Sequence, residues 1–165
     1  MLTQTSELAI KTLIFLAVQG EGKPLSPRRI ALSMDCSPSY LAKTVGHLVR
    51  TGLLRSVRGS AGGVLLARVP QEISLLDVVE ACQGLITAQY CDRADETTNL
   101  CSFHRAMAEL HEAVIGTLTD WTLEDLLRCP ASPEAPGHQC KMLFSGCEAY
   151  CETTGDLERE KQKAH

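Results

Sequence analysis

Residues 53–69 have the sequence LLRSVRGSAGGVLLARV, two short apolar runs of β-type residues joined by a turn that is rich in glycine and carries an arginine. Such runs on either side of a glycine-rich turn are typical of a β-hairpin. The residues upstream have the pattern of two short helices with a tight turn between them. A hairpin in this place corresponds to the wing of a winged helix-turn-helix, so the sequence predicts a DNA-binding fold.

Three helices are expected before the hairpin. Residues 6–19 place leucine, alanine and phenylalanine on one helical face, and Gly20 ends the run. Ser-Pro pairs that begin at Ser26 and Ser37 each supply an N-cap and a favourable first residue. Gly52 ends the third helix. Two capped helices so close together must cross, which leaves the second one able to enter a major groove.

The second half of the chain has a different character. Ser74 and Asp77 form a capping box for a helix that stops at Gly84, and a polar stretch without periodicity follows. From Ser102 onward an apolar stripe runs along one helix, longer than so small a chain needs for its own core, and it predicts pairing with a second subunit. Its members are Phe103, Met107, Leu110, Val114 and Leu118. Thr122 with Asp125 caps one more short helix.

We therefore expect a mainly α fold with a small β-hairpin, built as a winged helix-turn-helix plus a long dimerisation helix. The predicted parts are listed in chain order: a DNA-binding domain over 1–84, a cluster-binding loop over 85–104, the dimerisation helix and a short helix over 102–128, and a cysteine-containing tail over 129–165.

The charge of the chain is unevenly distributed. The 165 residues carry a formal charge of −4, which by itself argues against a nucleic-acid partner. Residues 23–68, however, hold eight Lys and Arg residues and one acid, Asp35, so this block carries +7 and the remainder −11. This basic block predicts a double-stranded DNA partner.

The composition also indicates the compartment. The apolar run 8–18 is too short to span a bilayer and contains Lys11, and no signal-peptide cleavage site follows a basic start. We expect a cytoplasmic protein without a membrane partner. A cytoplasmic location disfavours a permanent disulfide framework among the eight cysteines, and metal, cluster or redox chemistry explains some of them better.

The candidate DNA contacts lie on the second and third helices and the wing. Short hydroxyls, a phenol and an ammonium on outward turns of the third helix suit base edges or phosphates, two arginines at the start of the second suit phosphates, and the wing tip suits the minor groove or backbone. The alternative for the wing glycines is a purely geometric role in the turn. The residues are Ser39, Tyr40, Lys43 and Thr44; Arg28 and Arg29; and Arg58, Gly59 and Ser60.

The cysteines form two groups of candidate ligands. Cys91, Cys101 and His104 bracket the irregular loop, and Cys-x2-His at a helix start gives a rigid anchor for a metal group. Cys36 and Cys82 are expected to be buried as small hydrophobes. The tail offers a second, weaker metal site or a redox dithiol, or simply dispensable thiols, at Cys129, Cys140, Cys147 and Cys151.

Several motifs together resemble the IscR-like and NsrR-like family of bacterial winged-helix regulators. They are TSELAIKTLIFLA from residue 5, SPSYLAKTVGHLVRTGLL from 37, VRGSAGGVLL from 57, ISLLDVVEAC from 73 and WTLEDLL from 121. The resemblance implies homodimers with crossing long helices, many of which hold an iron–sulphur cluster near the dimer interface that governs operator binding.

The resemblance also implies a ligand set. The family loop bears three cysteines, sometimes followed by histidine; here Cys91, Cys101 and His104 match, and the middle cysteine is absent. Some relatives use a carboxylate from the first helix of the partner, and Glu7 holds that position. Two thiolates and two harder ligands favour a [2Fe-2S] over a [4Fe-4S] cluster, although a tail cysteine is an alternative ligand and some relatives bind no cluster.

The sequence thus predicts a homodimeric transcriptional regulator, a repressor that senses redox state, nitric oxide or iron–sulphur status. The alternative is a cluster-free winged-helix repressor controlled by cysteine thiol chemistry, a tail zinc site or a partner protein. A metal-dependent enzyme is disfavoured because no Ser/His/Asp set, phosphate loop or paired-carboxylate pocket is evident.

Overall fold

The computed structural model describes residues 2–20, 22–59, 61–86 and 101–127. Ser60, Cys91 and the tail cysteines Cys129, Cys140, Cys147 and Cys151 therefore lie outside the described residues. The elements, in chain order, are α1 (Gln4–Gln19), α2 (Pro27–Ser33), α3 (Pro38–Arg50), β1 (Leu54–Val57), β2 (Gly63–Leu66), the 3₁₀ turn η1 (Pro70–Glu72), α4 (Leu75–Gln83), α5 (Ser102–Asp120) and α6 (Leu123–Leu127). The winged helix-turn-helix and the long helix are thereby confirmed.

The helix starts follow local side-chain caps. The hydroxyl of Ser26 accepts a hydrogen bond from the backbone N–H of Arg29 at 3.3 Å, and that of Ser37 accepts from the N–H of Tyr40 at 3.2 Å. Both caps satisfy N–H groups that have no partner inside the helix. Helix α1 starts two residues earlier than predicted, because Thr3 caps it.

The wing is an antiparallel hairpin in which Leu54 pairs with Leu66 and Val57 with Gly63. A third segment, which the sequence did not predict, extends it: Leu25 and Val64 exchange two backbone hydrogen bonds of 2.9 Å. A Cβ atom on Gly63 would collide with the carbonyl of Leu25, so glycine is required by this approach. Gly59 at the tip has a φ of +118°.

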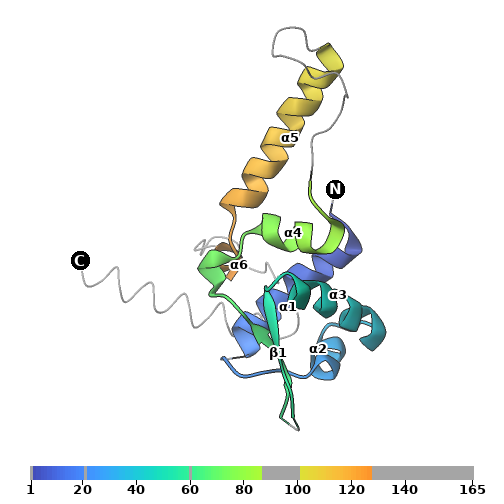
Figure 1. Cartoon of the computed structure of the whole chain (residues 1–165), viewed down its shortest axis with the longest axis vertical. Helices are drawn as coiled ribbons and strands as arrows, with labels where there is room; N and C mark the ends of the chain where they lie inside the picture. Colours follow the sequence, from blue (N-terminus) through green and yellow to red (C-terminus); the bar gives the residue numbers. More distant parts are fainter. Residues whose placement is uncertain (1, 21, 60, 87–100, 128–165) are drawn as a thin grey trace, which may run out of the picture.

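The core surrounds α1. This helix contacts α3, α4, α6 and β2 and lies at the centre of the body in Figure 1. The core is almost entirely aliphatic, as the low aromatic content predicted, and its fully buried members include Leu13, Ile30, Leu41, Leu48, Leu53, Ile73, Val78 and Leu123. A tightly packed aliphatic core of this kind fixes the relative positions of the three helices before the wing.

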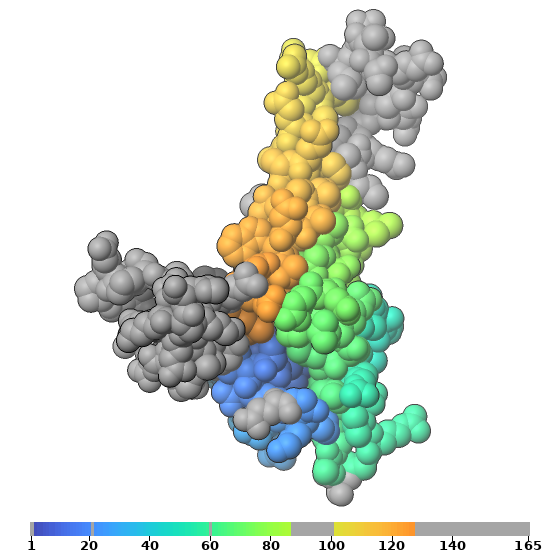
Figure 2. All heavy atoms as spheres, turned by 90° about the vertical axis from the view of Figure 1, so that its left-hand side faces the viewer, coloured from blue at the N-terminus to red at the C-terminus, as the bar shows by residue number. Residues whose placement is uncertain are grey.

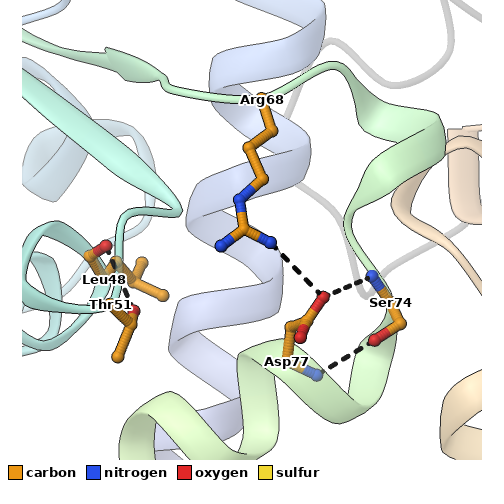
Figure 3. A network of polar contacts seen from close by, with 5 residues as sticks. All are labelled: Leu48, Thr51, Arg68, Ser74 and Asp77. Carbon is orange, nitrogen blue, oxygen red and sulfur yellow. Dashed lines mark hydrogen bonds and ion pairs between the residues drawn. The ribbon is translucent and has the colours of Figure 1, made fainter.

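Both ends of α4 are attached to neighbouring segments. At its start, the predicted capping box is present: the N–H of Asp77 donates to the Ser74 hydroxyl at 3.1 Å, and the N–H of Ser74 donates to the Asp77 carboxylate at 3.3 Å. The guanidinium of Arg68, which follows the wing, lies 3.9 Å from the same carboxylate (Figure 3). The backbone N–H of Leu75 also donates to the carbonyl of Trp121 at 2.9 Å, and the N–H of Leu123 donates to the carbonyl of Ile73 at 2.8 Å.

Helix α5 stands out from this body in Figures 1 and 2. None of its 19 described residues is buried. The single apolar stripe predicted here is divided by the structure: Phe103 and Leu110 are 62% and 52% exposed, whereas Met107, Val114 and Leu118 are half-buried. Within the described residues, no helix is long and apolar enough to cross a membrane.

Candidate functional site

The exposed face of α3 is the first part of the candidate site. Its wholly exposed members include Ser39, Lys43 and Arg50, and the intervals of three and four residues place them on one side of the helix. The same face includes Ala42, which is exposed, and Gly46 and His47, which are half-buried. Between the polar side chains the face is therefore low, which allows the helix to approach a groove closely.

Thr44 does not belong to this face, and the prediction that it reads DNA is wrong. Its side chain is fully buried, and its hydroxyl donates to the carbonyl of Tyr40 at 3.1 Å. Thr44 occupies the same side of α3 as Leu41 and Leu48, which pack into the core. A hydroxyl in such a place is satisfied by the carbonyl one turn earlier, so its polarity did not indicate exposure.

Tyr40 lies at the boundary between the exposed face of α3 and its buried side. Its side chain is half-buried, and its hydroxyl lies 3.1 Å from Oγ1 of Thr5 in α1. The first turn of α3 is therefore in contact with the first turn of α1. The phenol can still offer its remaining hydrogen-bonding capacity to an external group.

Arg50 and His47 were missed as a pair. The guanidinium of Arg50 donates to Nδ1 of His47 at 2.8 Å, and both residues lie at the C-terminal end of the exposed face. The continued spacing from Ser39 through Lys43 to these two residues is the signal that would have found them. The pair extends the cationic face along the whole helix.

The remaining predicted DNA contacts are also at the surface. Arg28 and Arg29 are exposed in the first turn of α2, and Arg58 and Gly59 are exposed at the tip of the wing. Figure 1 shows the hairpin, α2 and α3 at one end of the molecule, with the start of α5 at the opposite end. Arg68 differs from the other cations of the basic block, because it forms an ion pair with Asp77.

The second part of the candidate site is the start of α5. Cys101 is the N-cap of this helix and is exposed, and its Sγ lies 2.9 Å from Nδ1 of His104. The backbone N–H of His104, and then its imidazole, stabilise the thiolate and hold the pKa of Cys101 below its ordinary value. A thiolate and an imidazole side by side at the surface are suitable donors to a metal or an iron–sulphur group.

Of the other predicted ligands, Glu7 lies within the described residues, and it is not brought to this pair within one chain. Glu7 is exposed in the first turn of α1, and Figure 1 shows the start of α1 far from the start of α5. In the part of the chain that the structure describes, no group of three or more Cys, His, Asp or Glu side chains is placed to hold a metal ion. The Cys101 thiolate and the His104 imidazole are thus two donors that fit an iron–sulphur group, and further ligands are needed to complete the set.

Cys36 and Cys82 pack against the core as small hydrophobes, but they are less buried than the sequence predicted. Each is half-buried and packs against the hydrophobic core. Burial raises the pKa of both thiols, and the carboxylate of Asp35 adds to this effect at Cys36. Of the described cysteines, Cys101 is thus the one whose surroundings favour the reactive thiolate.

Comparison with known proteins adds a family to this geometry. A family profile described as "Rrf2: Iron-dependent Transcriptional regulator" matches residues 2–129. The regulator NsrR of Halalkalibacterium halodurans is 30% identical over 132 residues, which are 76% of this chain and 89% of that protein. NsrR of Geobacillus kaustophilus is 32% identical over 135 residues, which are 79% of this chain and 92% of the relative.

Solved structures of similar fold include two CymR proteins and an IscR. The global cysteine regulator CymR of B. subtilis superposes with a TM-score of 0.63 at 27% identity, over 76% of this chain and 95% of CymR. Staphylococcus aureus CymR in an oxidized form gives a TM-score of 0.62 at 26% identity, over 76% and 94% of the two chains. T. potens IscR, at 22% identity and a TM-score of 0.64, covers 85% and 96% and shares the fold.

Proposed function

This chain belongs to the Rrf2 family of transcriptional regulators, and from that premise we propose that it is a homodimeric, sequence-specific repressor that senses redox state, nitric oxide or iron–sulphur status. The observation that carries the proposal is the separation of two surfaces: the cationic face of α3 and the wing at one end, and the Cys101–His104 pair at the other.

The DNA contacts are assigned by exposure and chemistry. Ser39, Lys43 and the Arg50–His47 pair face the major groove, where hydroxyl, ammonium and guanidinium groups reach base edges and phosphates. Arg28 and Arg29 bind phosphates beside the groove, and Tyr40 contributes at the edge of the face. Arg58, with Gly59 and Ser60, reaches the minor groove or the backbone.

The wing provides a test with a matched control. A DNA duplex selected from a random-sequence pool with the wild-type protein serves as operator. Arg58→Ala should weaken binding to it and lower the slope of log K against log salt by roughly 0.9, the loss of one phosphate contact. Arg68→Ala is the control, because Arg68 already forms an ion pair with Asp77. Equal effects of the two variants would remove the wing contact from the proposal.

The proposed homodimer is supported by the exposed side of α5. Phe103 and Leu110 lie on it, and two exposed alanines, Ala106 between them and Ala113 after Leu110, leave room for the side chains of another helix. A second copy of α5 is chemically matched to such a face. Two-fold pairing presents two α3 helices to the DNA, so the operator should contain two half-sites about one or more helical turns apart, roughly 34 Å or multiples of it.

For sensing, we assign Cys91, Cys101 and His104 of one subunit, with Glu7 of the other, as ligands of a [2Fe-2S] cluster. Such a cluster supplies redox and nitric-oxide-sensitive chemistry when bound. Cys101 donates through a thiolate that its surroundings favour, and His104 keeps its imidazole next to that sulfur. Glu7 is exposed and therefore accessible to another subunit.

The spectrum of protein purified without oxygen tests this assignment. We expect visible absorbance with about two irons and two sulphides per cluster, lost in Cys91→Ser and Cys101→Ser and kept in the control Cys36→Ser. A chromophore that survives in Cys91→Ser moves the ligands to the tail cysteines Cys129, Cys140, Cys147 and Cys151. The expected count also separates a [2Fe-2S] from a [4Fe-4S] cluster.

A second candidate is a cluster-free regulator controlled by the Cys101 thiol. The exposed thiolate of lowered pKa favours it, and a relative of similar fold, S. aureus CymR, has been solved in an oxidized form. Here the Cys101 thiolate attacks one oxygen of a peroxide, forms a sulfenic acid and releases hydroxide. Colourless protein whose operator binding changes with peroxide in the wild type, and not in Cys101→Ser, would support this candidate.

A further inference from the structure

The first turn of α1 lies between the last turn of α4 and the first turn of α3. Its neighbouring residues Thr5 and Ser6 point their hydroxyls toward different helices. Ser6 donates to Oε1 of Gln83 at 3.1 Å, across 77 residues of sequence. Thr5 Oγ1 lies 3.1 Å from the hydroxyl of Tyr40, across 35 residues. Two adjacent residues thus join the end of α4 to the DNA-facing start of α3.

The contact between Ser6 and Gln83 joins a buried hydroxyl to the side-chain amide of an exposed residue. Ser6 is fully buried, and its hydroxyl also lies 2.9 Å from Oγ1 of Thr3. Because a hydroxyl has one proton and that of Ser6 goes to Gln83, Thr3 must be the donor in the second contact. A shift of Gln83 would leave a buried donor without its acceptor, which is unfavourable. The buried hydroxyl of Ser6 therefore favours a position of the first turn of α1 that keeps this hydrogen bond to Gln83.

The last turn of α4 is also where the chain leaves toward the candidate ligands. Gln83 ends the helix, and the backbone N–H of Ile86 donates to Oε1 of Glu80 at 3.1 Å. Glu80 thus binds the start of the outgoing segment, while Gln83 binds α1. Glu7, the ligand proposed for the other subunit, directly follows Ser6.

The body of α1 is less able to move than its first turn. Leu8, Ala9 and Leu13 are buried in the core, whereas Leu2, Thr3 and Gln4 are exposed. At the other side of the link, Tyr40 is held by its backbone N–H on Ser37 and by its hydroxyl at Thr5. A displacement of the first turn of α1 therefore shifts the side chain of Tyr40.

We propose that Gln83, Ser6, Thr5 and Tyr40 form a positioning relay, in which the last turn of α4 sets the orientation of Tyr40 on the DNA-facing turn of α3. The inference rests on the proposed function, because it requires that this turn contacts DNA. Thr5, Ser6 and Gln83 act through Tyr40 and have no contact with DNA of their own. One set of hydrogen bonds thereby connects the last turn of α4, from which the outgoing segment leaves, to the recognition helix α3.

A double-mutant cycle tests the relay in full-length, iron-free protein with the selected DNA duplex. Gln83→Leu and Thr5→Val each remove one hydrogen bond at nearly constant volume and should weaken binding by roughly two- to tenfold. In a relay, the double variant binds no more weakly than the weaker single variant. Losses that multiply, or single variants that bind like the wild type, overturn the relay.

Two controls separate positioning from general damage. Gln71→Leu removes a hydrogen bond of 2.7 Å to Glu124 that lies outside the relay. This variant should bind DNA as the wild type does, and the double variant with Gln83→Leu should bind DNA as Gln83→Leu alone does. Thr5→Ser, which keeps the hydroxyl, should restore the affinity lost in Thr5→Val, and failure of this rescue counts against the relay. If the wild-type protein selects no duplex, the proposed function fails and the relay with it. If it binds and the cycle is multiplicative, the relay alone is wrong.

Discussion

Helices α1 and α5 have similar lengths, yet among the described residues the other elements surround α1 and leave much of α5 exposed. Eight of the 16 residues of α1 are buried, and none of the 19 residues of α5 is. Both helices carry apolar side chains at helical spacing. The difference shows that an apolar stripe alone does not decide whether a helix is buried. The presence of other elements packed against it does.

The body around α1 and the helix α5 also differ in hydrogen bonding and in solvent exposure. In the body, Ser6, Thr12 and Thr44 are fully buried, and among the described residues no buried side-chain nitrogen or oxygen atom lacks a hydrogen bond. On α5, Phe103 and Leu110 remain largely in water. Covering the part of each that is still exposed would contribute roughly 1–2 kcal/mol. Among the described residues, the polar groups of the body are thus satisfied, whereas α5 exposes the apolar side on which we propose that a second copy packs.

The largest expected effect on stability comes from creating a cavity beside the buried helix α1. Leu13→Ala, at a fully buried position of α1, should lower the free energy of unfolding by about 2–5 kcal/mol through lost contacts and a cavity. Leu32→Ala is the matched control, because Leu32 is 76% exposed on α2 and should change it by at most about 0.5 kcal/mol. Urea unfolding followed by circular dichroism measures both. Similar losses would contradict the assignment of α1 as the core helix.

The next effect tests the open side. Leu110→Glu places a charge on the exposed face of α5 and should raise the dissociation constant of the dimer at least about 30-fold, the effect of an interface hot spot. The helix itself should remain, since Leu110 is 52% exposed in the single chain. Sedimentation equilibrium gives the constant, with Glu112→Gln as control. An unchanged constant would mean that another surface forms the dimer.

The start of α5 should also differ from the body in cysteine reactivity. Because its pKa is lowered, Cys101 keeps its thiolate at pH values where Cys36 and Cys82, whose pKa values are raised, are protonated. At pH 7 it should react with iodoacetamide at least about tenfold faster, and lose this reactivity as the pH falls through its lowered pKa. Peptide mass spectrometry resolves the sites. His104→Asn should slow Cys101 alone, and equal rates in the wild type would contradict the thiolate.

The smallest effects concern the junction between wing and α4. Ser74→Ala removes half of the capping box and should cost about 1 kcal/mol of unfolding free energy. Arg68→Ala should cost less, because its partly exposed ion pair with Asp77 is 3.9 Å long and screened by water. Urea unfolding at low and high salt separates the two. A larger loss for Arg68→Ala would show that the ion pair, and not the cap, attaches the wing to α4.

Short-range patterns correctly predicted where α2, α3, α4 and α6 start, whereas α1 starts two residues earlier than predicted. Ser26, Ser37, Ser74 and Thr122 all cap the helices that the sequence assigned to them. In each case the hydroxyl binds an N–H three residues later, so the interaction depends on the residue types within a single turn. The Cys101–His104 pair has the same spacing and was predicted as a candidate for the same reason.

Longer-range relations were missed or only partly predicted. Thr44 looked like a surface residue because threonine is polar, but its position beside Leu41 and Leu48 on α3 puts it in the core. The pairing of Leu25 with Val64 could not be expected from a segment too short to show strand periodicity. The stripe on α5 was recognised as apolar, yet only the position of α4 decides which side of it is covered.

By itself, the sequence determined where the helices begin, that a hairpin follows the third of them, and that a basic block occupies this part of the chain, since all three depend on neighbouring residues. Only the tertiary structure decided that Ser6 meets Gln83, that Thr5 meets Tyr40 and that Leu110 stays in water. Contacts between residues 35 and 77 positions apart depend on how whole helices pack around α1, and no local pattern encodes that packing.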